Sequence, residues 1–146
     1  MNHAPAAGRL KAVLDTNIYI AAFQFPKGRN AVLWRAAVAG HFRLLVSPAI
    51  IREMARVLRT DFEWEEGRIQ DVLRRVADVA RGGIVNPRTT IRAVTADPDD
   101  NRILECAVAG GADIIVSNDR HLLDLKIWNT IPIIAGVDFR RTLGLK

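Results

Sequence analysis

The chain has 146 residues, of which 49% are hydrophobic and 25% charged, and its formal net charge is +5. This composition excludes an intrinsically disordered protein, and no apolar run approaches the roughly 20 residues of a membrane span. We therefore expect one soluble globular domain at residues 10–146, after a flexible tail at residues 1–9. The positive charge favours a polyanionic partner such as nucleic acid. A single cysteine excludes an internal disulfide, so the cytoplasm is the expected compartment.

The first predicted element is a buried strand, because residues 12–15 form a short apolar run that ends on an acid. A loop that contains Pro26 is expected next. Residues 31–38 have the apolar spacing of a helix, and Gly40 suits its end. Residues 42–46 then predict a second strand. This order of elements begins an alternation of strands and helices.

The middle of the chain continues the alternation. Ser47 suits the N-cap of a helix and Pro48 its first position, so a helix is predicted to begin there. A second amphipathic helix is expected at residues 65–80, and residues 84–85 predict a short third strand.

The last third starts with the stretch TADPDDNRILECA, which predicts a helix that runs to Gly110. Residues 113–117 and 131–135 predict two further strands, and a short helix is expected near residues 138–143. Strands that alternate with helices in this way predict a three-layer α/β/α sandwich with a mostly parallel sheet of about five strands.

Two acids are placed where strands end. Asp15 ends the first strand, and Asp119 lies two residues beyond residues 113–117. Ligands of open α/β sheets bind beyond the carboxyl ends of the strands, so we expect both carboxylates on one edge of the sheet.

Helical spacing assigns a third acid to the same edge. Asp100 precedes Ile103, Leu104, Ala107 and Val108 by three, four, seven and eight residues, so it tops the predicted inward face of its helix. The neighbouring acids at positions 97 and 99 fall in a proline-containing turn, where we expect them to cap the helix or face solvent.

The sequence is consistent with two roles for the carboxylate of Glu53. It lies on the helix that begins at Ser47, where a carboxylate near the first turn is favourable beside the helix dipole, or it is aimed at the edge that carries Asp15. Converging carboxylates repel one another unless a cation lies among them, and oxygen ligands select Mg²⁺ or Mn²⁺. In a basic protein, such a pocket suits phosphodiester hydrolysis.

Three stretches, VLDTNIYIAAF, SPAIIREMARVL and DPDDNRILECAVAGGADIIVSNDRHLL, resemble the motifs of PIN-domain nucleases. The resemblance spans about residues 11–143 and is nearest to the VapC-like toxins of toxin–antitoxin systems. It implies an Mg²⁺- or Mn²⁺-dependent endoribonuclease, usually a homodimer and blocked by a cognate antitoxin. By position, it implies four catalytic, metal-holding acids: Asp15, Glu53, Asp100 and Asp119. The polar supports that it implies are Thr16, Asn17 and Ser117.

Three further side chains bear on RNA binding and catalysis. Lys27 and Arg29 are candidates, because the loop after the first strand is expected to overhang the acidic edge. His121, two residues after Asp119, is read as a packing or edge histidine rather than as a base.

Two alternative functions stay open. A phosphotransferase of the haloacid-dehalogenase type also begins with an acid at the end of a first strand, but normally has a second Asp where this chain has Asn17. A non-catalytic RNA-binding or interaction module would not need four acids on one edge.

Overall fold

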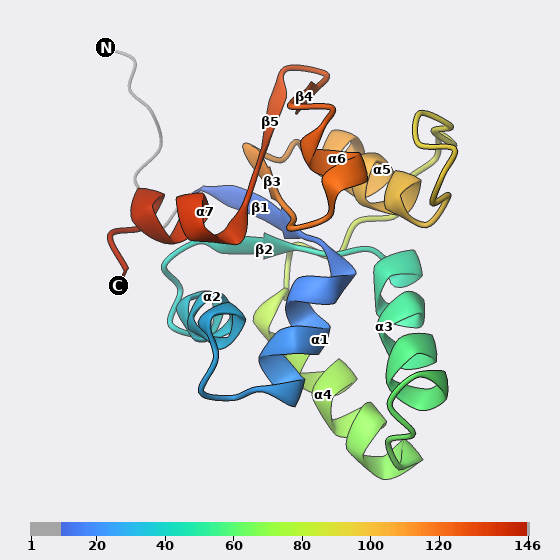
Figure 1. Cartoon of the computed structure of the whole chain (residues 1–146), viewed down its shortest axis with the longest axis vertical. Coiled ribbons are helices and arrows are strands. Elements are labelled where there is room, and N and C mark those ends of the chain that lie inside the picture. The colour runs from blue at the N-terminus through green and yellow to red at the C-terminus, as the bar shows by residue number, and fades with distance from the viewer. Residues whose placement is uncertain (1–9, 146) are drawn as a thin grey trace.

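A five-stranded sheet lies at the centre of the computed structural model, which describes residues 10–145 (Figure 1). The strands are β1 (Lys11–Leu14), β2 (Arg43–Leu45), β3 (Ile114–Val116), β4 (Ile127–Trp128) and β5 (Ile131–Ile134). Their order is β2-β1-β3-β5-β4, and all neighbouring pairs are parallel except β4 and β5. The prediction of a mostly parallel sheet of about five strands is confirmed. The predicted tail at residues 1–9 lies outside the described residues.

Helices cover the sheet on both faces. They are α1 (Thr16–Gln24), α2 (Arg29–Val38), α3 (Pro48–Thr60), α4 (Glu66–Val79), α5 (Asp100–Gly110), α6 (Arg120–Leu123) and α7 (Gly136–Thr142). Helix α5 packs on β1, β2 and β3, while α1 packs against α2 and α3 on the other side of the sheet (Figure 1). Between residues 10 and 145, no helix is long and apolar enough to span a membrane.

The start of α3 follows its sequence pattern. Ser47 has an extended backbone, and its side-chain oxygen accepts a hydrogen bond from the backbone N–H of Ile50. Pro48 occupies the first turn, where its missing N–H costs no hydrogen bond. Because this start is local in origin, the sequence alone was sufficient to predict it.

Helix α1 was missed by the sequence analysis, which expected a loop after the first strand. Its side chains are buried on several sides, including those of Ile18, Tyr19, Ile20 and Phe23. Such a helix has no polar stripe, so the amphipathic period that identifies a surface helix is absent. Helix α1 therefore carries the chain away from the end of β1.

The edges of the sheet differ from the prediction as well. Residues 84–85 do not form a full strand, because Ile84 pairs with Val46 through one isolated bridge. The fifth strand is instead β4, which pairs antiparallel with β5 through Ile127 and Trp128. Its tight connections place Lys126, Asn129 and Thr130 at positive φ without any glycine, and Asn129 is the only one of the three that favours such a turn.

Strand β1 positions the candidate site. It lies between β2 and β3, and Ala12, Val13 and Leu14 are almost completely buried. Leu14 is in register with Val116 of β3. The two residues that follow this pair, Asp15 and Ser117, therefore emerge side by side at the carboxyl edge of the sheet.

Candidate active site

Asp15 and Ser117 form the floor of the candidate site. The hydroxyl of Ser117 donates a hydrogen bond of 2.7 Å to Oδ2 of Asp15 and accepts one of 2.9 Å from the backbone N–H of Asp119. Asp15 is 4% exposed and Ser117 is completely buried. One hydroxyl thus links the ends of β1 and β3 and orients both acids.

Asp119 is held by the start of α6. It is the N-cap residue, and its Oδ1 accepts a hydrogen bond of 2.8 Å from the backbone N–H of His121. The imidazole Nδ1 of His121 lies 3.5 Å from the same oxygen. The Asp119 side chain is 18% exposed, so it lies between the buried floor and solvent.

Asp100 reaches the site from a separate element. It is the first residue of α5 and is only 5% exposed, as its helical spacing predicted. Its Oδ2 is buried and has no hydrogen-bond partner. A buried carboxyl oxygen without a partner is costly, because burial removes its water and nothing replaces it.

Asp15, Asp100 and Asp119, which we call the acidic cluster, influence one another electrostatically. Burial raises the pKa of Asp15 to about 6, the hydrogen bond from Ser117 opposes this rise, and the charge of Asp119 adds to it. Burial and then the charges of Asp15 and Asp119 raise the pKa of Asp100 to about 8. The structure therefore brings together three of the four predicted acids, and a cation among them would reverse these shifts.

A group suited to a metal ion lies at this place. Among residues 10–145, ligand atoms of Asp100, Asp119 and His121 lie within 4.8 Å of one another. Together with the unpartnered oxygen of Asp100, this donor set fits a divalent cation. His121 was expected from the sequence to be a packing or edge residue. Its spacing of two residues from Asp119 was the available signal.

Glu53 is not brought into this group. Its carboxylate receives two hydrogen bonds from the guanidinium of Arg56, one of them 3.1 Å from Nε. The hydrogen bond to Glu53 raises the pKa of the exposed Arg56. The charge of Asp99 also raises this pKa. Glu53 thus lies on α3 near the start of α5, but its carboxylate forms an ion pair with Arg56.

The polar residues after Asp15 differ in their roles. Thr16 is buried, and its backbone N–H lowers the pKa of Asp15. Asn17 is exposed, and its side chain makes no hydrogen bond to another described residue. The structure therefore agrees with backbone support from Thr16 and shows no carboxylate oriented by Asn17. Position 17 faces solvent because α1 starts directly after the strand.

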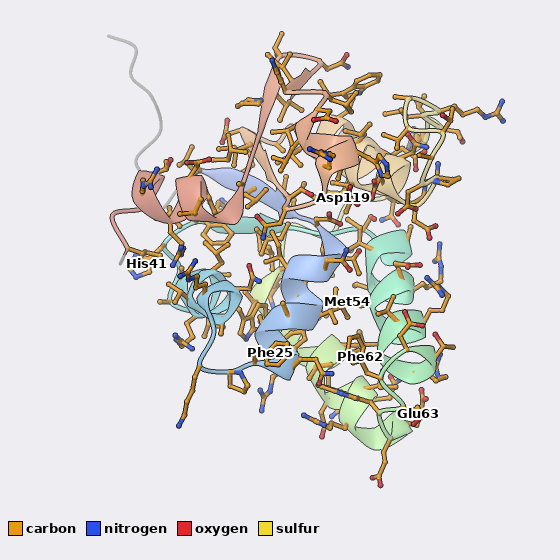
Figure 2. The ribbon with its side chains drawn as sticks, in the orientation of Figure 1. Phe25, His41, Met54, Phe62, Glu63 and Asp119 are labelled. Atoms are coloured by element: carbon orange, nitrogen blue, oxygen red, sulfur yellow. The ribbon has the colours of Figure 1, made fainter. Side chains whose placement is uncertain are left out.

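The predicted position of Lys27 is wrong, whereas the expectation for Arg29 stays a prediction, because its neighbour Asn30 contacts Asn118, next to Asp119. The nine residues of α1, which rise roughly 1.5 Å each, separate the acidic cluster from the loop that follows. Phe25, at that end of α1, lies far from Asp119 in Figure 2. Lys27 therefore does not overhang the acidic edge. Arg29 starts α2, whose Asn30 contacts the amide of Asn118.

The two acids of the turn before α5 differ in their contacts. Asp99 is exposed and makes no side-chain capping bond. Asp97 instead accepts a hydrogen bond of 3.2 Å from the backbone N–H of Asp99. The charge of Asp97 contributes to the raised pKa values of Asp15 and Asp100, so Asp97 lies nearer the cluster than the sequence indicated.

Two buried side chains of α5 hold the irregular segment that leads into the site. The amide of Asn101 makes two hydrogen bonds of 2.8 Å, one to the N–H and one to the carbonyl of Val94. Oε2 of Glu105 accepts a hydrogen bond of 2.8 Å from the N–H of Ile91. Neither residue could be identified from sequence patterns, because their partners have no regular spacing.

Comparisons with known proteins show the family of the chain. The family model of the PIN domain matches residues 11–121. The uncharacterized protein MJ1680 of Methanocaldococcus jannaschii is 29% identical over 126 residues, which cover 83% of this chain and 78% of that protein.

Solved structures share the fold. PAE2754 from Pyrobaculum aerophilum aligns with a TM-score of 0.60 at 15% identity, over 95% of this chain and 92% of that one. FitAcB from Neisseria gonorrhoeae aligns with a TM-score of 0.55 at 14% identity, over 86% and 98%. At these identities the structures bear on the fold alone.

Proposed function

Because the chain belongs to the PIN domain family, which indicates a nuclease, we propose that it is a divalent-metal-dependent endoribonuclease. One observation carries the metal dependence: Oδ2 of Asp100 is buried without a partner beside two other carboxylates. A cation among the three carboxylates would satisfy that oxygen and offset the repulsion at the same time.

Asp100 and Asp119 are the acids that would hold the ion, with Asp15 beside them. When bound, Mg²⁺ or Mn²⁺ supplies a water of lowered pKa and stabilises charge on the leaving oxygen. Ser117 has the role of keeping Asp15 oriented and charged, through the 2.7 Å hydrogen bond. Glu53 would join only after its carboxylate leaves Arg56, so its role is secondary in this proposal.

RNA is the proposed substrate class. The net charge of +5 favours a polyanion as the substrate. Exposed Arg120 follows Asp119 directly and is a candidate for contact with a phosphate beside the scissile bond.

We also propose that the protein is the toxin of a toxin–antitoxin pair, acts in the cytoplasm and forms a homodimer. The family resemblance motivates these roles. A surface for protein partners is available in an apolar groove between α2 and α4, which Trp34, Val38 and Val79 line. Val38 is 57% exposed there. Light scattering tests the assembly, and a monomer mass at high concentration contradicts the dimer.

The activity is tested with the purified chain, single-stranded RNA and single-stranded DNA of one sequence, and Mg²⁺ or Mn²⁺. We expect endonucleolytic cleavage of RNA that EDTA abolishes. The variant Asp100→Asn keeps the size and loses the charge, so it should fold and not cleave. Cleavage by this variant, or cleavage in EDTA, contradicts the metal mechanism.

A further inference from the structure

A nitrogen donor stands beside the acids of the candidate metal site. His121 belongs to the three-residue group whose ligand atoms lie within 4.8 Å of one another, together with Asp100 and Asp119. The other two members offer only oxygen. The donor set in the structure is therefore mixed, whereas the sequence analysis expected oxygen alone.

Local structure holds this arrangement. The Asp119 side chain caps α6, because its Oδ1 accepts a hydrogen bond from the backbone N–H of His121. This hydrogen bond closes a three-residue turn. The turn places Nδ1 of His121 3.5 Å from Oδ1 of Asp119. The side chain of His121 is 51% exposed, so the imidazole is accessible from solvent.

An independent observation points to a ligand at this position. Asp100 comes from α5, more than nine-tenths of its surface is buried, and its Oδ2 has no hydrogen-bond partner. A cation placed between Asp100 and Asp119 would satisfy that oxygen. His121 would contact the same cation from the side that faces solvent.

We propose that His121 is a metal ligand, and that its imidazole makes the site prefer Mn²⁺ to Mg²⁺. This inference rests on the proposed function, because it concerns the same ion. Mg²⁺ demands oxygen ligands and gives up water reluctantly, whereas imidazole nitrogen is a good ligand for transition-metal ions. Removing His121 therefore lowers the affinity for Mn²⁺, because the ion loses a nitrogen ligand. The affinity for Mg²⁺ changes little, because water takes the place of the imidazole.

A simpler reading is that His121 forms an ion pair with Asp119 and takes no part in metal binding. The two readings differ in the bound state. A ligand nitrogen is bonded directly to the ion, whereas a charged imidazole repels the ion and weakens its binding.

The experiment compares the full chain with His121→Ala, His121→Asp and the control His41→Ala. His41 is exposed and lies far from Asp119 in Figure 2. Calorimetric titration measures Mn²⁺ and Mg²⁺ affinity, and electron spin echo spectroscopy of bound Mn²⁺ detects a directly bonded nitrogen. Melting in EDTA confirms that each variant folds.

We expect the nitrogen signal in the wild-type protein and in His41→Ala, and its loss in His121→Ala. The Mn²⁺ affinity of His121→Ala should fall at least about tenfold, with Mg²⁺ affinity changed much less. His121→Asp should shift the preference towards Mg²⁺. Bound Mn²⁺ without a nitrogen signal, or equal loss of both ions in His121→Ala, overturns the inference and leaves the proposed function standing. Failure of the wild-type protein to bind either ion overturns both.

Discussion

The hydroxyl of Ser117 and the carboxylate of Asp15, 102 positions apart in the chain, share a hydrogen bond of 2.7 Å in the buried floor of the site. The parallel register of β1 and β3 creates this contact, because Leu14 pairs with Val116 immediately before the two residues. Ser117 also accepts the backbone N–H of Asp119. One hydroxyl therefore supports two acids of the cluster.

Removing that hydroxyl should destabilise the protein and weaken its site. In Ser117→Ala, Asp15 loses its donor, so its pKa rises further above about 6 and its charged form becomes more costly. We expect the free energy of unfolding to fall by about 1.5–3 kcal/mol, the usual value of a hydrogen bond to a charged group. Urea unfolding at pH 7 in EDTA measures this change.

The control for Ser117→Ala is Thr142→Ala, which removes an exposed hydroxyl that donates to the backbone of Asp138. That change should stay within roughly 0.5 kcal/mol. Equal unfolding free energies for the two variants would show that the Ser117 hydrogen bond contributes nothing.

The metal-free protein should lose stability as the pH rises. Asp100 has a pKa of about 8 in the folded chain and near 3.8 in the unfolded chain, so the folded state holds its proton more tightly. The stabilisation from that proton is complete below about pH 4 and is lost as the pH rises to about 8. Asp15 adds a smaller loss that ends near pH 6.

Thermal melting between pH 4 and 9 in EDTA checks this dependence. Asp100→Asn carries no titrating group, so its curve should be flatter. At pH 8 it should melt at least about 3 °C above the wild-type protein, a shift that corresponds to roughly 1 kcal/mol in a domain of this size. A variant that melts below the wild-type protein at pH 8 contradicts the repulsion in the cluster.

Asp97 and Asp99 should behave differently, although both precede α5 in the same turn. Asp97 contributes to the raised pKa of Asp15 and of Asp100, whereas Asp99 is exposed and is not among the main causes of either shift. Asp97→Asn should therefore shift the metal-free melting curve and weaken Mn²⁺ binding a few-fold. Asp99→Asn should change neither. Paired melting and titration of the two variants measure the contrast, and identical behaviour would remove Asp97 from the site.

Replacing Lys27 should matter less for RNA binding than replacing Arg120. Lys27 follows the far end of α1, while exposed Arg120 adjoins Asp119. If Arg120 contacts a phosphate, Arg120→Ala reduces the slope of log affinity against log salt by about one. Binding in EDTA at several salt concentrations tests this, because cleavage is then suppressed. A larger effect of Lys27→Ala would place the RNA along α1 instead.

Local patterns in the sequence determined much of the site. The position of Asp100 followed from helical periodicity, since the apolar residues Ile103, Leu104 and Ala107 share its face and are buried. Val108 was wrongly assigned to that face, because it lies at the end of the helix and is 38% exposed. The edge that Asp15 and Asp119 share followed from their places after parallel strands. These inferences succeeded because the helical period is local and because strands that alternate with helices pair in parallel.

Tertiary structure decided the rest. Helix α1 has no sequence period because it is buried on several sides, and its presence moved Lys27 away from the acidic edge. Three contacts depend on the directions of side chains. They are the ion pair of Glu53 with Arg56, the proximity of His121 to Asp100, and the hydrogen bonds between Asn101 and Val94. A pattern of residue types does not specify which of several nearby charges a carboxylate will meet. That choice is set by the packing of whole helices against the sheet, to which residues throughout the chain contribute.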